Sequence, residues 1–171
     1  VPTTDKPCFL ELKKKYKSIV FKRRISAPYT DIKSYMAGED SGIENSQILK
    51  EIDYFRRFYG CLKPAADIFY DREAFYDRTD SSVRLTFDSN ALARGWDLEL
   101  ENGIYGERVL ENGLYILEVK TSGAMPMWIA EMLNEFKIYP ISFSKYGTAY
   151  KNGLLTRENK KIITLGGEYC A

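Results

Sequence analysis

Glutamate and lysine recur two residues apart in two segments that alternate like β-strands. The segments are Leu10-Glu11-Leu12-Lys13 and Leu117-Glu118-Val119-Lys120. Residues two apart in a strand point to the same face, so each pair places a carboxylate beside an ammonium group. A face of this kind could bind phosphate groups together with a divalent metal ion that bridges phosphate oxygens. Each pair alone is a weak signal, because an exposed ion pair of small energetic value has the same spacing.

Other charged residues follow the polar faces of further predicted strands. The stretch 9–25, FLELKKKYKSIVFKRRI, predicts a hairpin, and the alternation over 66–75, 82–87 and 114–120 predicts three more strands. Their polar faces carry Glu11, Lys13, Lys15, Lys22, Arg24, Arg72, Arg84, Glu118 and Lys120. If these faces enclosed one lumen, like charges about 6 Å apart would repel by roughly 3 kcal/mol. A polyanion would then be needed, and phosphate chains suit the donors of arginine and lysine.

Each residue also has an ordinary structural explanation. Lys13, Lys15, Lys22 and Arg23 could line a solvated strand face or a charged edge, and Lys145 could extend from an aromatic cluster. The candidate ion pairs are Arg72 with Asp71 or Glu73, Arg84 with Asp88, and Glu118 with Lys120. Only the joint pattern favours a phosphate site.

The composition narrows the possible chemistry. The 171 residues are 44% hydrophobic and predict a single domain, and a formal net charge of +1 argues against a nucleic-acid-binding protein. No histidine is present, which excludes histidine-dependent triads and imidazole zinc sites. A metal ion would therefore be held by carboxylate and substrate oxygens, which favours Mg²⁺ or Mn²⁺.

The spacing of the cysteines and the hydropathy of the sequence predict the cellular location of the protein. Three cysteines lie far apart without metal-type spacing, which favours free thiols and a cytoplasmic location. No apolar run of about 18 residues and no signal-peptide pattern is present. We expect a protein without its own membrane span, with a membrane-protein partner still possible.

Helices are expected between and after the strands. Thr30 is a candidate cap for a helix over 31–37, and Asn45 or Ser46 for one that ends at Gly60. A third helix should start at Pro126 and end before Pro140, with Met125, Met127 and Trp128 packed against a sheet. The predicted class is α+β: an antiparallel β-tunnel, closed or partly closed, with the helices packed outside.

Several blocks of the sequence resemble the bacterial form of the VTC-type polyphosphate polymerase domain, which is related to the triphosphate tunnel metalloenzymes. The blocks are FLELKKKYKSIVFKRRI, EIDYFRRFYGCLKPA, IFYDREAFY, VRLTFD, LEVKTSGAMPMWI and YPISFSKYGTAY, and they occur in family order over residues 9–150. The resemblance implies a β-tunnel that polymerises polyphosphate from the γ-phosphate of ATP with manganese or a similar divalent ion.

The resemblance also implies roles for individual residues. It makes Lys13, Lys22, Arg24, Arg72, Arg84 and Lys145 the catalytic phosphate-binding residues, with Lys120 as a further cation beside ATP. It makes Glu118 the metal ligand, with Glu11 as a second carboxylate. Family members normally begin with further strands, so residues 1–171 are expected to form one N-terminally incomplete domain, whose open sheet edges could pair with a second copy.

Two other functions fit the same residues. A tripolyphosphate or nucleoside triphosphate hydrolase would use water in place of the phosphate acceptor. A noncatalytic module would bind polyphosphate or inositol phosphates without turnover.

Overall fold

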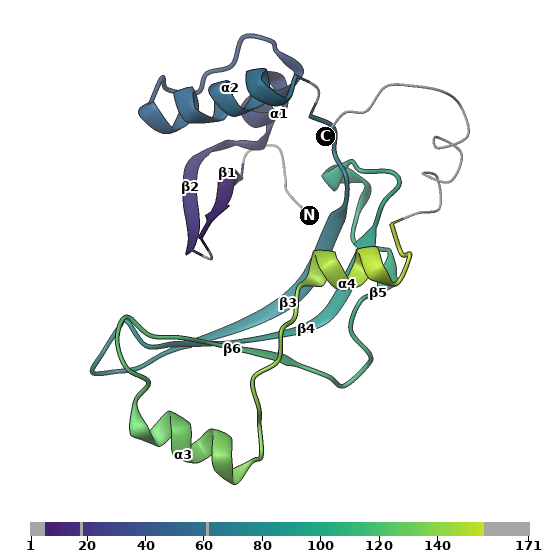
Figure 1. The fold of residues 1–171 in the computed structure, drawn as a ribbon. Coiled ribbons are helices and arrows are strands. Elements are labelled where there is room, and N and C mark those ends of the chain that lie inside the picture. Colours follow the sequence, from purple (N-terminus) through teal and green to yellow (C-terminus); the bar gives the residue numbers. More distant parts are fainter. Residues whose placement is uncertain (1–5, 18, 61, 156–171) are drawn as a thin grey trace. The chain divides into compact units, whose positions relative to one another are not determined.

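The computed structural model describes residues 6–17, 19–60 and 62–155, which belong to two compact units (Figure 1). The first unit comprises 6–64 together with 99–103, and the second comprises 65–98 and 104–155. Each unit has its own antiparallel sheet and its own hydrophobic core. The α+β class predicted from the sequence is therefore confirmed.

A β-hairpin and two helices build the first unit. The elements are β1 (Pro7–Tyr16), β2 (Ile19–Pro28), α1 (Tyr29–Ala37), α2 (Gln47–Tyr59) and the short 3-10 helix η1 (Leu100–Asn102). The strands pair over their whole length, and the strand sequence alternates, so one face of the hairpin is apolar. Leu12 of that face is buried against Tyr35 of α1 and Ile52 of α2. The predicted packing of helices on the apolar strand face is confirmed for this unit.

Capping residues set the ends of the first two helices. The Ser46 side chain accepts a hydrogen bond from the Leu49 backbone N–H, and Gly60 ends α2 with a positive φ, both as the sequence predicts. The expected cap at Thr30 is wrong. Helix α1 begins two residues before the expected start at Asp31, directly after Pro28, whose restricted φ suits a helix start and which makes no side-chain cap.

A four-stranded sheet forms the centre of the second unit. Its strands are β3 (Asp67–Tyr76), β4 (Arg84–Arg94), β5 (Glu107–Arg108) and β6 (Ile116–Lys120). All pairings are antiparallel, and β4 is central, because it pairs with each of the other three strands. Strand β4 is longer than the expected segment 82–87 and continues through a bulge at Asn90, which has a φ of 50°.

The bulge exchanges the side to which β4 residues point. Asp71 of β3 lies opposite Ser89, whereas Phe69 lies opposite Leu92, so β4 has one more residue than β3 between these pairs. Before the bulge, Asp88 shares a face with Arg72, and after it Ala93 shares that same face with Ile68. One side of the sheet is therefore polar at one end and apolar at the other.

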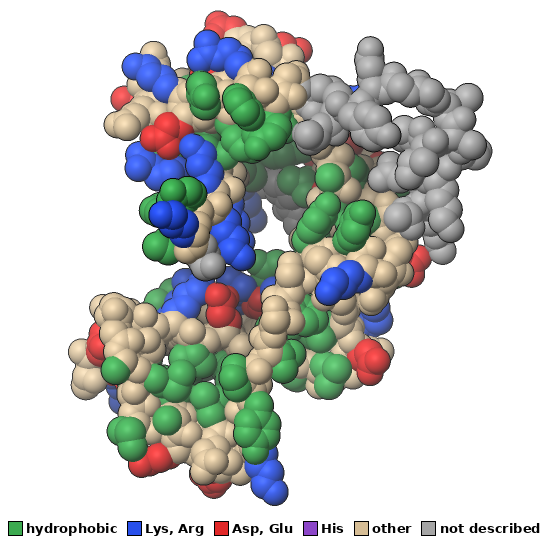
Figure 2. All heavy atoms as spheres, viewed as in Figure 1, with side chains coloured by type: hydrophobic (Ala, Val, Ile, Leu, Met, Phe, Trp, Pro, Cys, Tyr) green, Lys and Arg blue, Asp and Glu red, His purple; other side chains and the backbone are tan. Residues whose placement is uncertain are grey.

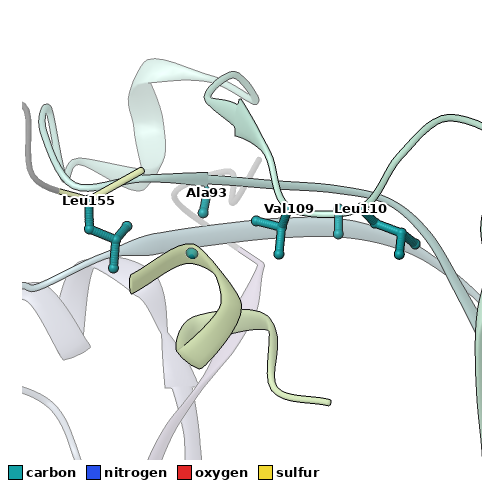
Figure 3. Close-up of a cluster of buried hydrophobic side chains, with 6 residues drawn as sticks. Ala93, Val109, Leu110 and Leu155 are labelled. Carbon is teal, nitrogen blue, oxygen red and sulfur yellow. The ribbon is translucent and has the colours of Figure 1, made fainter. Parts of the chain in front are cut away.

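The apolar end of that side is covered by a short helix. Helix α4 (Lys145–Lys151) contacts β4, and its Ala149 is fully buried beside Ala93. Ala91, Val109, Leu110 and Leu155 complete this cluster of small and branched side chains (Figure 3). The small alanines allow the helix to lie close to the strand.

Helix α3 (Met127–Glu135) buries less than the sequence suggests. Ile129 is its fully buried residue, but Met127 and Trp128 are 72% and 45% exposed, so their expected packing against a sheet is wrong. The helix also ends at Glu135, ahead of Pro140, because the chain leaves helical geometry with Lys137 at a φ of 52°. Its exposed side chains do not contribute to a core in the described part of the chain.

Neither sheet closes on itself in residues 6–17, 19–60 and 62–155, so the expected closed tunnel is not seen there. The first unit contributes a two-stranded ribbon and the second an open sheet. Among the described residues, no helix has the length and apolar character needed to cross a bilayer.

Candidate functional site

The polar end of the sheet in the second unit gathers charged side chains from three strands. Residues that lie opposite each other in an antiparallel pair point to the same face. The register sets Arg72 opposite Asp88, Thr86 opposite Glu118, and Arg84 opposite Lys120. The polar face is defined here as Arg72, Arg84, Thr86, Asp88, Glu118 and Lys120.

Asp88 lies at the centre of the ion pairs on this face. Its carboxylate accepts hydrogen bonds from Arg72 Nε and Nη2 at 2.6 and 2.7 Å, and from Lys145 Nζ at 2.5 Å. The Asp88 side chain is only 3% exposed, whereas that of Arg72 is 31% exposed. One buried carboxylate therefore holds two cations that come from β3 and from the start of α4.

These contacts change the pKa of Asp88 and that of Arg72. Burial by itself raises the pKa of Asp88, but the hydrogen bonds from Arg72 and Lys145 outweigh it, and the pKa lies below its ordinary value. The hydrogen bond to Asp88 raises the pKa of Arg72. Asp88 is thus ionised at neutral pH, and Arg72 remains charged.

Arg84 differs from the other cations because no carboxylate pairs with it among the described residues. Its Nε is buried and has no hydrogen-bond partner there, and its guanidinium carbon lies 5.3 Å from the centre of the Tyr76 ring. The Thr86 hydroxyl, on the same face, is also buried without a partner in the described part of the chain. Buried polar groups are normally paired, so this face has donor capacity that the described protein groups do not use.

Glu118 is the exposed carboxylate of the face. It forms an ion pair with Lys120 at 3.2 Å, as the sequence suggests, and its other oxygen lies 3.9 Å from Arg72 Nη2. Its side chain is 46% exposed, so the ion pair adds little stability and the carboxylate is accessible.

The single exposed carboxylate of this face fits a magnesium or manganese site whose other ligands are phosphate and water oxygens. No group of three potential metal-ligating side chains occurs within the described residues. Mg²⁺ commonly binds one or two carboxylates and completes its coordination with phosphate and water oxygens. Glu118 could supply the protein ligand in such a site.

Lys145 occupies an unusual place for a cation. It is the first residue of α4, which Ser144 caps by accepting a hydrogen bond from the Gly147 backbone N–H. Its Nζ lies 4.2 Å from the centre of the Tyr70 ring, while Arg72 lies 5.1 Å from the same ring. Tyr70 thus lies beside both cations that Asp88 binds, in keeping with the aromatic setting expected for Lys145.

The hairpin of the first unit has a second cationic face, opposite the helices. Register places Glu11 opposite Arg24, Lys13 opposite Lys22, and Lys15 opposite Val20. Glu11 binds Lys22 at 2.7 Å, and Arg24 lies over the Phe9 ring at 4.4 Å. Four cations and one carboxylate share this face, and Figure 2 shows basic side chains gathered along the hairpin.

A buried arginine elsewhere in the second unit provides a contrast. Arg94 is fully buried, and its Nε and Nη2 donate to Asp67 at 3.1 and 2.7 Å. Its guanidinium carbon lies 5.1 Å from the centre of the Phe69 ring and 4.2 Å from that of Tyr105. This pair is a structural element of the fold, whereas the Arg84 Nε has no hydrogen-bond partner in the described part of the chain.

The structure assigns the candidate residues to two groups. Lys13, Lys22, Arg24 and Glu11 lie on the hairpin face of the first unit, and Arg72, Arg84, Lys120, Lys145 and Glu118 lie together in the second unit. Asp88 is the residue that sequence reasoning left out of the site. Its position on the same strand face as Arg84 was the available signal, but its true partner, Arg72, depends on the register between strands.

The site is thus of a class that offers cations from several antiparallel strands around an exposed carboxylate. The family model of the VTC domain matches residues 1–153, and the chain belongs to this family. The match covers both units. No curated protein and no solved structure shows significant similarity to the chain. The family is known for polyphosphate polymerase activity, so membership indicates a polyphosphate-related function.

Proposed function

We propose that the protein polymerises inorganic polyphosphate from the γ-phosphate of ATP on the polar face of the second unit. The observation that carries this proposal is Arg84, a half-buried cation without a carboxylate partner among the described residues, beside three further cations. Arg72, Lys120 and Lys145 are those cations, and only two carboxylates, Asp88 and Glu118, accompany the four. A phosphate chain would supply the missing negative charge and the hydrogen-bond acceptors.

The proposed reaction needs no protein nucleophile. A terminal oxygen of the growing chain attacks the γ-phosphorus, a new P–O bond forms, and the bond to the β–γ bridging oxygen breaks as ADP leaves. Charge is spread over the γ-phosphate oxygens in the transition state, so fixed cations can stabilise it. In this proposal Arg84 and Lys145 bind the transferring group, while Arg72 and Lys120 bind the neighbouring phosphates.

The proposal includes a divalent metal ion at Glu118. When bound, Mn²⁺ or Mg²⁺ would neutralise charge on phosphate oxygens of ATP. Lys120, which pairs with Glu118 at 3.2 Å, can turn towards a phosphate because its side chain is 54% exposed. Glu11 is a weaker candidate for a ligand because Lys22 already binds its carboxylate.

The hairpin face is the second part of the proposal. Lys13, Lys22 and Arg24 would bind phosphates of a chain or of ATP, since four cations there accompany a single carboxylate. A tunnel formed by further strand pairing at the open sheet edges belongs to the same proposal, which follows the family resemblance and the exposed edges.

Product analysis tests the proposed function. The protein is incubated with ATP and Mn²⁺, and products are separated by gel electrophoresis with polyphosphate staining alongside an assay for free phosphate. Long polyphosphate with stoichiometric ADP is expected. Release of orthophosphate alone would make the protein a hydrolase. Binding of polyphosphate without ADP formation would make it a noncatalytic module, and both results would reject polymerisation.

A further inference from the structure

The buried carboxylate of Asp88 has no direct place in the proposed reaction, although it makes the shortest contacts of the site. Its two oxygens receive three hydrogen bonds, two from Arg72 and one from Lys145. With its side chain 3% exposed, it is poorly placed to contact a polyphosphate chain itself. Its contribution must therefore come through the two cations.

The geometry of Arg72 shows what Asp88 leaves available. A guanidinium has five N–H donors in a fixed plane, and Asp88 uses one on Nε and one on Nη2. The bidentate contact fixes the orientation of this plane and leaves the other donors for a ligand. Arg72 Nη2 also lies 3.9 Å from Glu118, so the fixed guanidinium is held beside the proposed metal ligand.

Lys145 needs such a partner for a different reason. A cation at the first residue of a helix lies at the positive end of the helix dipole, which is unfavourable. The contact with Asp88 at 2.5 Å offsets this repulsion and restrains a side chain that would otherwise have many rotamers. Only 18% of the Lys145 side chain is exposed, which fits a restrained ammonium group.

We propose that Asp88 is a positioning residue that orients Arg72 and Lys145 for phosphate binding before the ligand arrives. The inference rests on the proposed function, because it assumes that these two cations bind phosphates. In this role, Asp88 reduces the side-chain conformational entropy that Arg72 and Lys145 would otherwise lose when phosphate binds.

Simple electrostatics and positioning predict opposite results for one substitution. Asp88→Asn removes a negative charge from a cationic site, which by charge alone would strengthen the binding of an anion. Positioning predicts the reverse, because an amide oxygen cannot receive the same charge-assisted contacts from both cations. The sign of the change in affinity therefore decides between them.

The test measures binding of inorganic tripolyphosphate by isothermal titration calorimetry. We expect Asp88→Asn to weaken binding by about tenfold or more. Asp71→Asn is the matched control, since it removes the same charge from an exposed side chain on the other face of β3, where Asp71 accepts from Asn90. Binding by Asp88→Asn that equals or exceeds that of the unmodified protein would overturn the proposal.

A second measurement needs neither Asp88→Asn nor tripolyphosphate. In ¹⁵N NMR of the free protein, the Arg72 Nε–H signal, assigned by its loss in Arg72→Lys, should exchange with water far more slowly than that of exposed Arg78. Equal exchange would refute the prior orientation of Arg72 by Asp88, even if Asp88→Asn does not fold. Failure of the unmodified protein to bind tripolyphosphate would instead reject the proposed function, while the NMR result would still decide whether Asp88 fixes Arg72.

Discussion

Replacing Arg84 with methionine should separate binding from stability. Its guanidinium has no carboxylate partner among the described residues, and its buried Nε lacks an acceptor there. A charge-assisted hydrogen bond to phosphate contributes about 1.5–3 kcal/mol, so its loss should weaken tripolyphosphate binding by about 10- to 150-fold. Removing a buried, unsatisfied donor relieves a desolvation cost of about 1–3 kcal/mol, so the free energy of unfolding should stay the same or rise.

Arg72→Met makes the informative comparison for stability. This substitution leaves the buried Asp88 carboxylate with Lys145 as its remaining partner, so the free energy of unfolding should fall by about 1–3 kcal/mol. Arg84→Met should show no such loss, although both residues lie on the same face of the sheet.

The assay combines calorimetric titration with tripolyphosphate and urea unfolding followed by circular dichroism. Arg78→Met serves as the charge-matched control, because Arg78 is exposed in the loop between β3 and β4. Its affinity should change little at moderate salt. The reasoning is refuted if Arg84→Met binds tripolyphosphate as tightly as Arg78→Met, or if it loses as much stability as Arg72→Met.

Three further predictions concern the metal, the packing and the pH dependence. Glu118→Gln should abolish metal-dependent activity in an ATP turnover assay while the unfolding curve stays nearly unchanged, since the Glu118 side chain is 46% exposed; retained turnover would reject the metal assignment. Gly95→Ala should lower the free energy of unfolding by about 1–3 kcal/mol, because the added Cβ would lie 2.7 Å from the Leu155 Cα; unchanged urea unfolding would contradict this close approach. Asp88 has a lowered pKa in the folded state, so its stabilisation is present above the ordinary value of 3.8 and is lost as the pH falls through the folded pKa; urea unfolding at pH 6 and pH 3 should show this loss, and Asp88→Asn should show less of it.

Local signals in the sequence were sufficient for the hairpin and for helix α2 of the first unit, but not for the start of α1. The alternation through the hairpin and the caps at Ser46 and Gly60 depend on neighbouring residues only. The cationic hairpin face followed directly, because a two-residue period fixes the side to which each charge points. The same holds for Glu118 and Lys120, whose predicted ion pair is confirmed.

Features that depend on contacts distant in the sequence could not be derived in this way. The partner of Arg72 is Asp88, 16 residues away, and the choice over the neighbouring Asp71 and Glu73 is made by the register of β3 on β4. Lys145 reaches the same carboxylate across 57 residues. No periodicity within one strand indicates such convergence.

The apolar composition of helix α3 led to a wrong prediction, because tertiary packing decides which of its side chains are buried. Met127 and Trp128 were expected to pack on a sheet, yet they are exposed, because the buried side of α3 in the described structure is restricted to Ile129. An apolar helix face shows that burial would be favourable, but it does not show that a surface is available to cover it.

The extra residue at Asn90 constrains how this strand can be redesigned or compared with related chains. Before Asn90, the even-numbered side chains of β4 lie on the polar face. After it, the odd-numbered residues Ala91 and Ala93 lie on the same side of the sheet and pack against α4. In a regular strand of the same length, without the bulge, Leu92 and Arg94 would point towards the helix in place of Ala91 and Ala93, while Arg84 and Asp88 kept their side. The odd spacing between Asp88 and Ala91 therefore requires the bulge. A transplanted segment of equal length and charge that formed a regular strand would keep its binding end and lose the support beneath Lys145.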